Sequence, residues 1–293
     1  MKRIITYLAG LLAFIISYTS VAQQKSGPND KSLLWRISSK KLTKPSYLFG
    51  TIHLICRADY LWTEKMKESL AKSDKVCFEM DLDDPSVMMQ VAAGMIDNSG
   101  KTLADYFTPE QYKLIKNYVK DSLGMDIAMI EKMKPVMLET LISTSGASDC
   151  ADAISYEDSI MKTALNDKKE VLGLETPEEQ LDVMASIPTD TVIKSLLDDI
   201  QNHNNNDTEY LQIISAYKKQ DLPAIYALLM NTKGMATDMG MFLDERNKKW
   251  IPRIDDKMQH SSVFFAVGAG HLWGDNGVIN LLRKKGYSVT PMK

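Results

Sequence analysis

The 293-residue chain has few cysteines and no large excess of charge of either sign. Its three cysteines, Cys56, Cys77 and Cys150, cannot all pair, and their spacing matches neither a zinc ribbon nor a disulfide framework. In an oxidising compartment Cys56 and Cys77 could form a disulfide, because both are expected near strand ends; buried free thiols fit the sequence equally well. The net charge of -3 and the pI near 5.9 leave no basic footprint, which argues against nucleic acid as a partner.

Common catalytic motifs are absent as well. The chain contains no Gly-x-Ser-x-Gly, His-Glu-x-x-His, P-loop or glycine-rich dinucleotide motif, which argues against the common serine hydrolases, zincins and nucleotide-binding proteins. Histidine is scarce, with four in the whole chain. Two of the four end an apolar run with the pattern Gly-x-x-His, in Tyr47–His53 and in Val263–His271. This repeated ending points to one shared site built from both ends of the chain.

The first 22 residues have the pattern of an export signal. Lys2 and Arg3 precede the almost wholly apolar run Ile4–Ile16, and Ser20–Ala22 supplies the small residues that a signal peptidase recognises. The apolar run is shorter than the roughly 18–20 residues that a membrane anchor needs. We therefore expect cleavage after Ala22, a flexible leader over 23–31, and a periplasmic or secreted protein without a transmembrane segment.

The remaining residues, 32–293, predict a single domain of the α/β (α+β) class. Apolar runs that are rich in aromatic and β-branched residues predict buried strands. They cluster at the two ends of the chain, so we expect a mixed central sheet built from N- and C-terminal strands and flanked by helices. Helical periodicity dominates from about 85 to 249, which predicts a large helical insertion; the polar run Asn202–Asp207 predicts a loop within it. The predicted strands are 33–38, 47–53, 76–81, 170–175, the run from 263, and an edge strand at 287–291.

Three residues at predicted strand ends could bind a metal: His53, Glu79 and His271. Ligands and catalytic groups of α/β proteins collect beyond the carboxyl ends of the strands. Two imidazoles and a carboxylate are suitable ligands for Mn²⁺, Co²⁺ or Zn²⁺ with open positions for water or substrate. A metal-free alternative uses the same residues, with a histidine as general base oriented by Glu79.

Two further charged residues are candidates for the same site. Glu175 follows the short strand at 170–175 and could be another ligand, a general base or a supporting residue; it could equally serve the helix that begins after Thr176. Arg246 shares a helix face with Phe242 and Trp250 at i±4 spacing, so it is expected to be buried and to need a carboxylate partner. It could orient Glu79 or Glu175, or hold an anionic group of a substrate or transition state. The alternative is an ordinary solvated charge on the helix.

These residues together resemble the TraB/GumN family, which includes the Tiki proteins. The resemblance runs from about residue 32 to the C-terminus. The matching elements, in order, are Leu34–Ile37, Leu48–His53, Phe78–Asp81, Gly173–Gln180, Glu245–Asn247 with Trp250, and Gly268–Leu272 followed by Gly274 and Gly286–Tyr287.

Similarity to the Tiki branch implies a metal-dependent peptidase with His53, Glu79 and His271 as its metal site and Glu175 and Arg246 in support. Distant similarity to erythromycin esterases and to haem-binding ChaN lipoproteins implies a mixed α/β core. We therefore expect metal-assisted hydrolysis of a peptide or other acyl bond, with a peptide or protein as substrate. The alternative is a binding protein that captures a peptide signal or haem. The methionine-rich helical region is also compatible with a homodimer surface.

Overall fold

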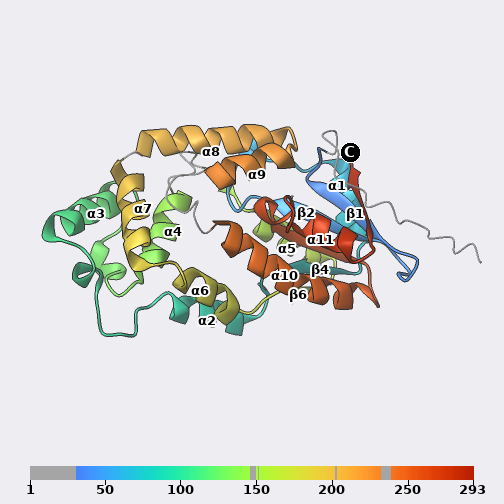
Figure 1. The fold of residues 1–293 in the computed structure, drawn as a ribbon, viewed down its shortest axis with the longest axis horizontal. Coiled ribbons are helices and arrows are strands. Elements are labelled where there is room, and N and C mark those ends of the chain that lie inside the picture. Colours follow the sequence, from blue (N-terminus) through green and yellow to red (C-terminus); the bar gives the residue numbers. More distant parts are fainter. Residues whose placement is uncertain (1–30, 146–149, 151, 202, 232–238) are drawn as a thin grey trace, which may run out of the picture.

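The computed structural model describes residues 31–145, 150, 152–201, 203–231 and 239–293 (Figure 1). The predicted export signal and all but the last residue of the predicted leader lie outside the described residues. Within the described part of the chain, no helix combines the length and apolar character needed to cross a membrane.

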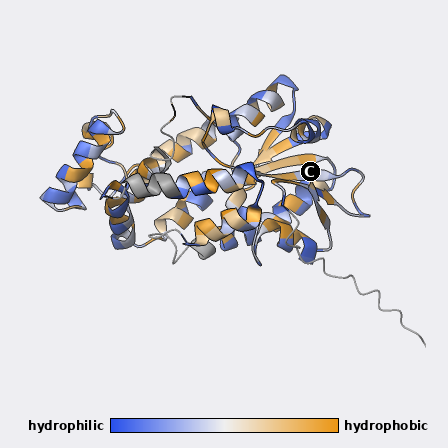
Figure 2. Cartoon of the chain, turned by 90° about the horizontal axis from the view of Figure 1, so that it is seen from above, coloured by the Kyte–Doolittle hydropathy of each residue, from blue (hydrophilic) through white to orange (hydrophobic). Residues whose placement is uncertain are grey.

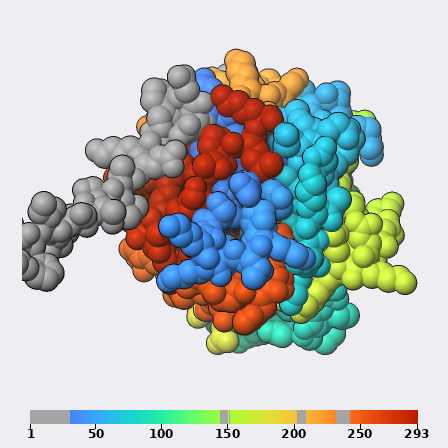
Figure 3. All heavy atoms as spheres, turned by 90° about the vertical axis from the view of Figure 1, so that its right-hand side faces the viewer, coloured from blue at the N-terminus to red at the C-terminus, as the bar shows by residue number. Residues whose placement is uncertain are grey.

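A six-stranded mixed sheet forms the centre of the fold, as the sequence predicts, with the strand order β6-β4-β7-β2-β1-β8. Strands β6, β4, β7 and β2 are parallel neighbours, whereas β1 is antiparallel to both β2 and β8. The N-terminal segment (blue) and the C-terminal segment (red) therefore lie side by side at one end of the molecule (Figure 3). The strands are β1 (Leu34–Ser38), β2 (Ser46–Thr51), β4 (Lys75–Phe78), β6 (Glu170–Gly173), β7 (Val263–Gly268) and β8 (Ser288–Met292).

The central strands β2 and β7 are almost wholly buried because helices cover both faces of the sheet. All six residues of β2 are buried, and five of the six residues of β7 are buried. Phe49 of β2 packs against Tyr156 with their ring centroids 5.5 Å apart, and the Tyr217 hydroxyl donates to the Gly50 carbonyl at 2.8 Å. Helical residues from the middle of the sequence thus anchor the end of β2, where the first Gly-x-x-His segment begins.

Helices occupy most of the chain between the N- and C-terminal strands. Several begin where capping residues predict: the Thr108 and Thr176 side chains accept from the backbone N–H of Gln111 and Glu179. The helices are α1 (Glu64–Lys72), α2 (Pro85–Gly94), α3 (Pro109–Asp121), α4 (Pro135–Ser145), α5 (Tyr156–Asn166), α6 (Pro177–Ala185), α7 (Thr189–Gln201), α8 (His203–Lys218), α9 (Leu222–Asn231), α10 (Met239–Met258) and α11 (Val278–Lys284). The prediction of a loop at 202–207 was wrong, because α8 already begins at His203; a polar composition is only a weak guide to helix ends.

A second, two-stranded sheet was not predicted. It pairs β3 (Ile55–Cys56) with β5 (Ala153–Ile154), and a disulfide joins Cys56 to Cys150 beside it. The disulfide suggested between Cys56 and Cys77 is wrong, because Cys77 is a buried free thiol in β4. Pairing β3 with β5 brings the distant Cys150 beside Cys56, whereas the side chain of Cys77 is buried in the core of the main sheet.

Part of the helical region between β4 and β7 has a hydrophobic core separate from the core around the sheet, whereas α5, α8 and α9 contribute residues to the core around the sheet. The helices of this second core include α3, α4 and α7, which lie to the left of the sheet in Figure 1. Figure 2 shows that these helices carry both hydrophobic (orange) and hydrophilic (blue) residues. The buried residues of this second core include Leu103, Ile115, Val119, Leu138, Ile142 and Leu196.

A buried carboxylate lies in this helical core and makes stability depend on pH. Glu139 of α4 is 4% exposed and accepts from the Ser195 hydroxyl of α7 at 3.4 Å. Burial and the nearby Asp199 carboxylate raise the pKa of Glu139 to about 7. The folded state therefore holds this proton more tightly than the unfolded state, so stability falls as the pH rises from the unfolded pKa near 4.5 through about 7.

We expect Glu139→Gln to stabilise the protein above pH 7 and to have little effect near pH 4.5. The difference between the two conditions should reach up to about 3 kcal/mol, because a pKa unit corresponds to about 1.4 kcal/mol. Urea unfolding at pH 5 and pH 8 measures it, with the exposed Glu209→Gln of α8 as the control. An equal effect of Glu139→Gln at both pH values would contradict the prediction.

Candidate functional site

Four candidate residues follow four neighbouring parallel strands of the sheet. His53 follows β2, His271 follows β7 in a short 3₁₀ helix (η4, Ala269–His271), Glu79 follows β4, and Glu175 follows β6. The carboxyl ends of parallel strands meet at one edge, so these residues are brought to the same region. Gly50 permits the approach of β2 to η4, because a Cβ there would lie 3.1 Å from the Cα of Ala269.

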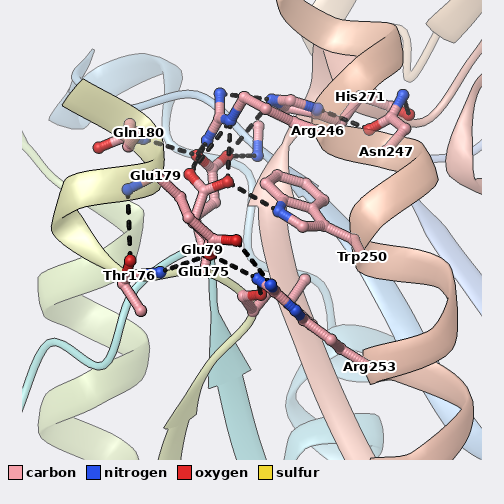
Figure 4. A network of polar contacts seen from close by, with 12 residues as sticks. Glu79, Glu175, Thr176, Glu179, Gln180, Arg246, Asn247, Trp250, Arg253 and His271 are labelled. Atoms are coloured by element: carbon pink, nitrogen blue, oxygen red, sulfur yellow. Dashed lines mark hydrogen bonds and ion pairs between the residues drawn. The ribbon is translucent and has the colours of Figure 1, made fainter. Parts of the chain in front are cut away.

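Arg246 of α10 is the centre of this region (Figure 4). Its side chain is 3% exposed and binds three other candidate residues. The Nη2 atom donates to Glu79 Oε2 at 2.6 Å and to Glu175 Oε1 at 2.5 Å, and Nη1 lies 3.1 Å from Nε2 of His271. The predicted shared helix face is confirmed as well: the guanidinium carbon of Arg246 lies 5.2 Å from the Phe242 ring centroid and 4.9 Å from the Trp250 ring centroid.

Glu79 is held in its ionised form. Its Oε1 accepts from the Gly268 backbone N–H at 2.9 Å, and Gln180 donates to Oε2 at 3.4 Å. Burial opposes ionisation, yet the positive charges of Arg246 and His53 together with the Gly268 N–H lower the pKa of Glu79 to about 2. The carboxylate is therefore negative at every physiological pH.

His271 is held in its neutral form. It is 3% exposed, and burial is the main reason that its pKa falls to about 3. Nδ1 lies 2.7 Å from Oδ1 of Asn247, an acceptor, while the Asn247 amide donates to the backbone oxygens of His271 and Asn276. This arrangement places the ring proton on Nδ1 and leaves a lone pair on Nε2, which lies 3.8 Å from Glu79 Oε1.

Glu175 differs from Glu79 in its affinity for a proton. Burial raises the pKa of Glu175, although Arg246 binds it through two nitrogens and the Trp250 indole donates to Oε2 at 2.8 Å. Two carboxylates share one guanidinium here, and Glu175 is the one that takes up a proton more readily. Its position before Thr176 also suits the start of α6, but its hydrogen bonds are to Arg246 and Trp250 of α10.

His53 lies apart from the group that Arg246 joins. Its side chain is 70% exposed, and Nδ1 lies 3.4 Å from Oε1 of Glu157, a residue of α5. The hydrogen bond with Glu157 and its charge raise the pKa of His53 to about 9, with a smaller contribution from the Glu79 charge. The structure thus brings Glu79, Glu175, Arg246 and His271 into direct contact and leaves His53 near them, paired with Glu157.

The comparison with protein families matches the TraB/PrgY/gumN family over residues 33–291. The chain belongs to this family. It is 25% identical to the protein named Metalloprotease TIKI1 of Danio rerio over 88% of this chain and 62% of that protein. It is 25% identical to the Metalloprotease TIKI homolog of Amphimedon queenslandica over 95% of this chain and 65% of that protein. With human Metalloprotease TIKI1 it shares 24% identity over 88% of this chain and 61% of that protein.

The chain therefore spans less than two thirds of the length of these curated relatives. No solved structure matches it. The family resemblance recognised from the motifs is confirmed, and these relatives are named metalloproteases.

The donor types at the strand ends fit a divalent metal ion, because His271 is neutral with an unprotonated Nε2 and Glu79 is ionised. Arg246 already contacts both of these ligand candidates, at Nε2 of His271 and Oε2 of Glu79. Within the described residues, no group of three His, Cys, Asp or Glu side chains is arranged to hold a metal. An ion bound at Glu79 and His271 would therefore share the site with the guanidinium or displace it from these two atoms.

Three contributors to the site were not predicted as site residues: Asn247, Gln180 and Glu157. Asn247 and Gln180 belong to the segments that carry the family resemblance, so their motif positions were a usable signal. Glu157 stands in the first turn of α5, in a sequence without a distinguishing pattern. The fold alone places it beside His53.

Proposed function

We propose that this chain is an exported metal-dependent hydrolase that cleaves a peptide or other acyl bond. The observation that carries the proposal is the pair of a neutral His271 and an ionised Glu79 at adjacent strand ends, enclosed with a buried Arg246. Similarity to relatives that are named metalloproteases supports peptides as the substrate class.

His53, Glu79 and His271 are the residues that would hold the ion, with Mn²⁺, Co²⁺ and Zn²⁺ as the candidates. With a pKa of about 9, His53 is protonated near neutral pH and would release its proton when it binds the ion. The chemistry that such an ion supplies is Lewis acidity, which polarises a carbonyl and makes water more acidic. Asn247 supports this use of His271 by holding the proton at Nδ1, because a histidine ligand usually donates its other ring N–H to an acceptor.

The remaining residues handle charge and protons. Glu175 has the higher proton affinity of the two carboxylates, so its oxygens can accept a proton while Glu79 stays ionised. Arg246 keeps a positive charge beside both, and its Nη1 can stabilise negative charge that develops on a substrate oxygen. Burial strengthens these interactions because little water competes with them.

Export is supported by the signal-like N-terminus and by the disulfide between Cys56 and Cys150. Disulfides persist in oxidising compartments such as the periplasm and the extracellular space. We therefore place the protein outside the cytoplasm.

Replacing either His53 or His271 with alanine should abolish measurable cleavage, a loss of at least about 100-fold. The test uses a mixed peptide library with Mn²⁺, Co²⁺ or Zn²⁺, and mass spectrometry quantifies bound metal in the same samples. His260→Ala is the matched control, because His260 is exposed beyond the end of α10. Circular dichroism checks that each variant is folded.

EDTA-sensitive cleavage together with one bound ion that is lost in the His53 and His271 variants is the expected result. Equal cleavage by both variants and the wild type would refute the assignment of these histidines. Bound metal with stoichiometric peptide capture and no product would refute hydrolysis in favour of a binding protein. A Soret band on adding hemin that is lost in the variants would favour haem as the captured ligand.

A further inference from the structure

The two histidines of the Gly-x-x-His motifs are fixed in different ways. Packing holds His271, since its ring is buried and lies 4.3 Å from the Trp250 ring, centroid to centroid. The His53 side chain is 70% exposed, so packing alone does not restrain its imidazole. An exposed side chain that has to present one nitrogen to a reacting group needs a polar partner to hold it.

Glu157 has the properties of such a partner. Its side chain is 16% exposed, and its Oε1 lies 3.4 Å from Nδ1 of His53. The same Oε1 accepts from the Thr51 hydroxyl at 2.6 Å, and Oε2 accepts from the Ser155 hydroxyl at 3.2 Å. Thr51 is buried at the end of β2, so the carboxylate is fixed from the sheet as well as from α5.

The backbone around this pair is cross-linked. Two residues after His53 the chain enters β3, and β5 ends three residues before Glu157. The two strands pair in the register Ile55 with Ile154 and Cys56 with Ala153, and the disulfide from Cys56 to Cys150 closes the same junction. Segments that are far apart in sequence are thus held together where His53 meets Glu157.

We propose that Glu157 is a positioning residue for His53: it fixes the imidazole through Nδ1 and leaves Nε2 available to a metal ion or a substrate. The proposal rests on the proposed function of His53. Histidines that bind metals usually donate their other ring N–H to a carboxylate or carbonyl, and a carboxylate orients the histidine of catalytic triads in the same way. The role of Glu157 is therefore the same whether His53 binds a metal or transfers a proton.

The direct test measures the mobility of the His53 ring in Glu157→Gln. With ¹³Cε1-labelled histidine, relaxation gives an order parameter for each of the four histidines, and His53→Ala assigns the signal. We expect a restrained ring in the wild type and, in Glu157→Gln, a fall toward the range below about 0.6 that marks flexible groups. His260, which is exposed beyond the end of α10, serves as a reference within the same sample.

Asp158→Asn is the matched control, because Asp158 is the exposed neighbour of Glu157 in the same turn of α5 and the substitution removes the same charge. It should leave the order parameter of His53 unchanged. If Glu157→Gln folds poorly, Thr51→Val removes the hydroxyl that fixes the carboxylate and should loosen the ring in the same direction by a smaller amount. A wild-type order parameter in whichever of these variants folds would overturn the proposal.

Activity gives a second readout. Glu157→Gln should lower kcat by about 10–100-fold with little change in KM, since loss of orientation affects the reacting state more than binding. Ring mobility is measured without substrate or metal, so its outcome is independent of the proposed function. A protein that neither binds metal nor cleaves peptides could still show the predicted loosening, whereas an active enzyme with an unaffected ring would refute the positioning role alone.

Discussion

Arg246→Gln is expected to destabilise the protein by about 3–5 kcal/mol, the usual cost of breaking a buried ion pair by removing one partner. Glutamine cannot replace the contacts to Glu79, Glu175 and His271 at the same time. The Glu175 side chain is 3% exposed and that of Glu79 is 15% exposed, so two carboxylates would remain in a region with little water. Urea unfolding at neutral pH measures the loss, and a folded variant should also lose cleavage activity.

Arg253→Gln is the matched control on the same helix. Arg253 pairs with Glu179, but these side chains are 38% and 27% exposed, so the expected cost is about 1 kcal/mol or less. The double variant Arg246→Gln/Glu175→Gln should recover part of the loss, because it also removes one of the uncompensated charges. Equal costs for Arg246→Gln and Arg253→Gln would show that the Arg246 cluster is not a buried charge network.

Replacing Cys56 and Cys150 together with serine should lower the free energy of unfolding by about 4–5 kcal/mol. The disulfide closes a loop of 94 residues, and a cross-link of that span restricts the unfolded chain strongly in the chain-entropy model. Urea unfolding of the oxidised wild type and of the double variant gives the difference directly. The loop contains Glu79 and ends shortly before Glu157, so the disulfide also holds the site region together.

Reductant supplies the control for this second prediction. The reduced wild type should unfold like the double variant, and reductant should leave the double variant unchanged, because Cys77 is a buried free thiol. An unfolding midpoint of the wild type that does not respond to complete reduction, verified by mass spectrometry, would contradict the assigned role of the disulfide.

Much of the framework of the site follows from local sequence patterns. The apolar runs that end at Thr51 and Gly268 predicted buried strands. A buried strand can be recognised from the pattern of apolar residues within a few positions of the sequence. Placing His53, Glu79, Glu175 and His271 after such runs was enough to expect them at one edge of the sheet. The i±4 spacing of Phe242, Arg246 and Trp250 likewise predicted which face of α10 is buried.

The sequence by itself thus determined the strands, their apolar character and the residue types at their ends, because these depend on neighbours in the chain. Only the tertiary structure decided which distant groups meet. It paired Cys56 with Cys150 rather than Cys77, placed Arg246 between Glu79, Glu175 and His271, and set Glu157 beside His53. Such contacts depend on the packing of segments that lie far apart in sequence, so the pattern of apolar and polar residues within one segment does not predict them.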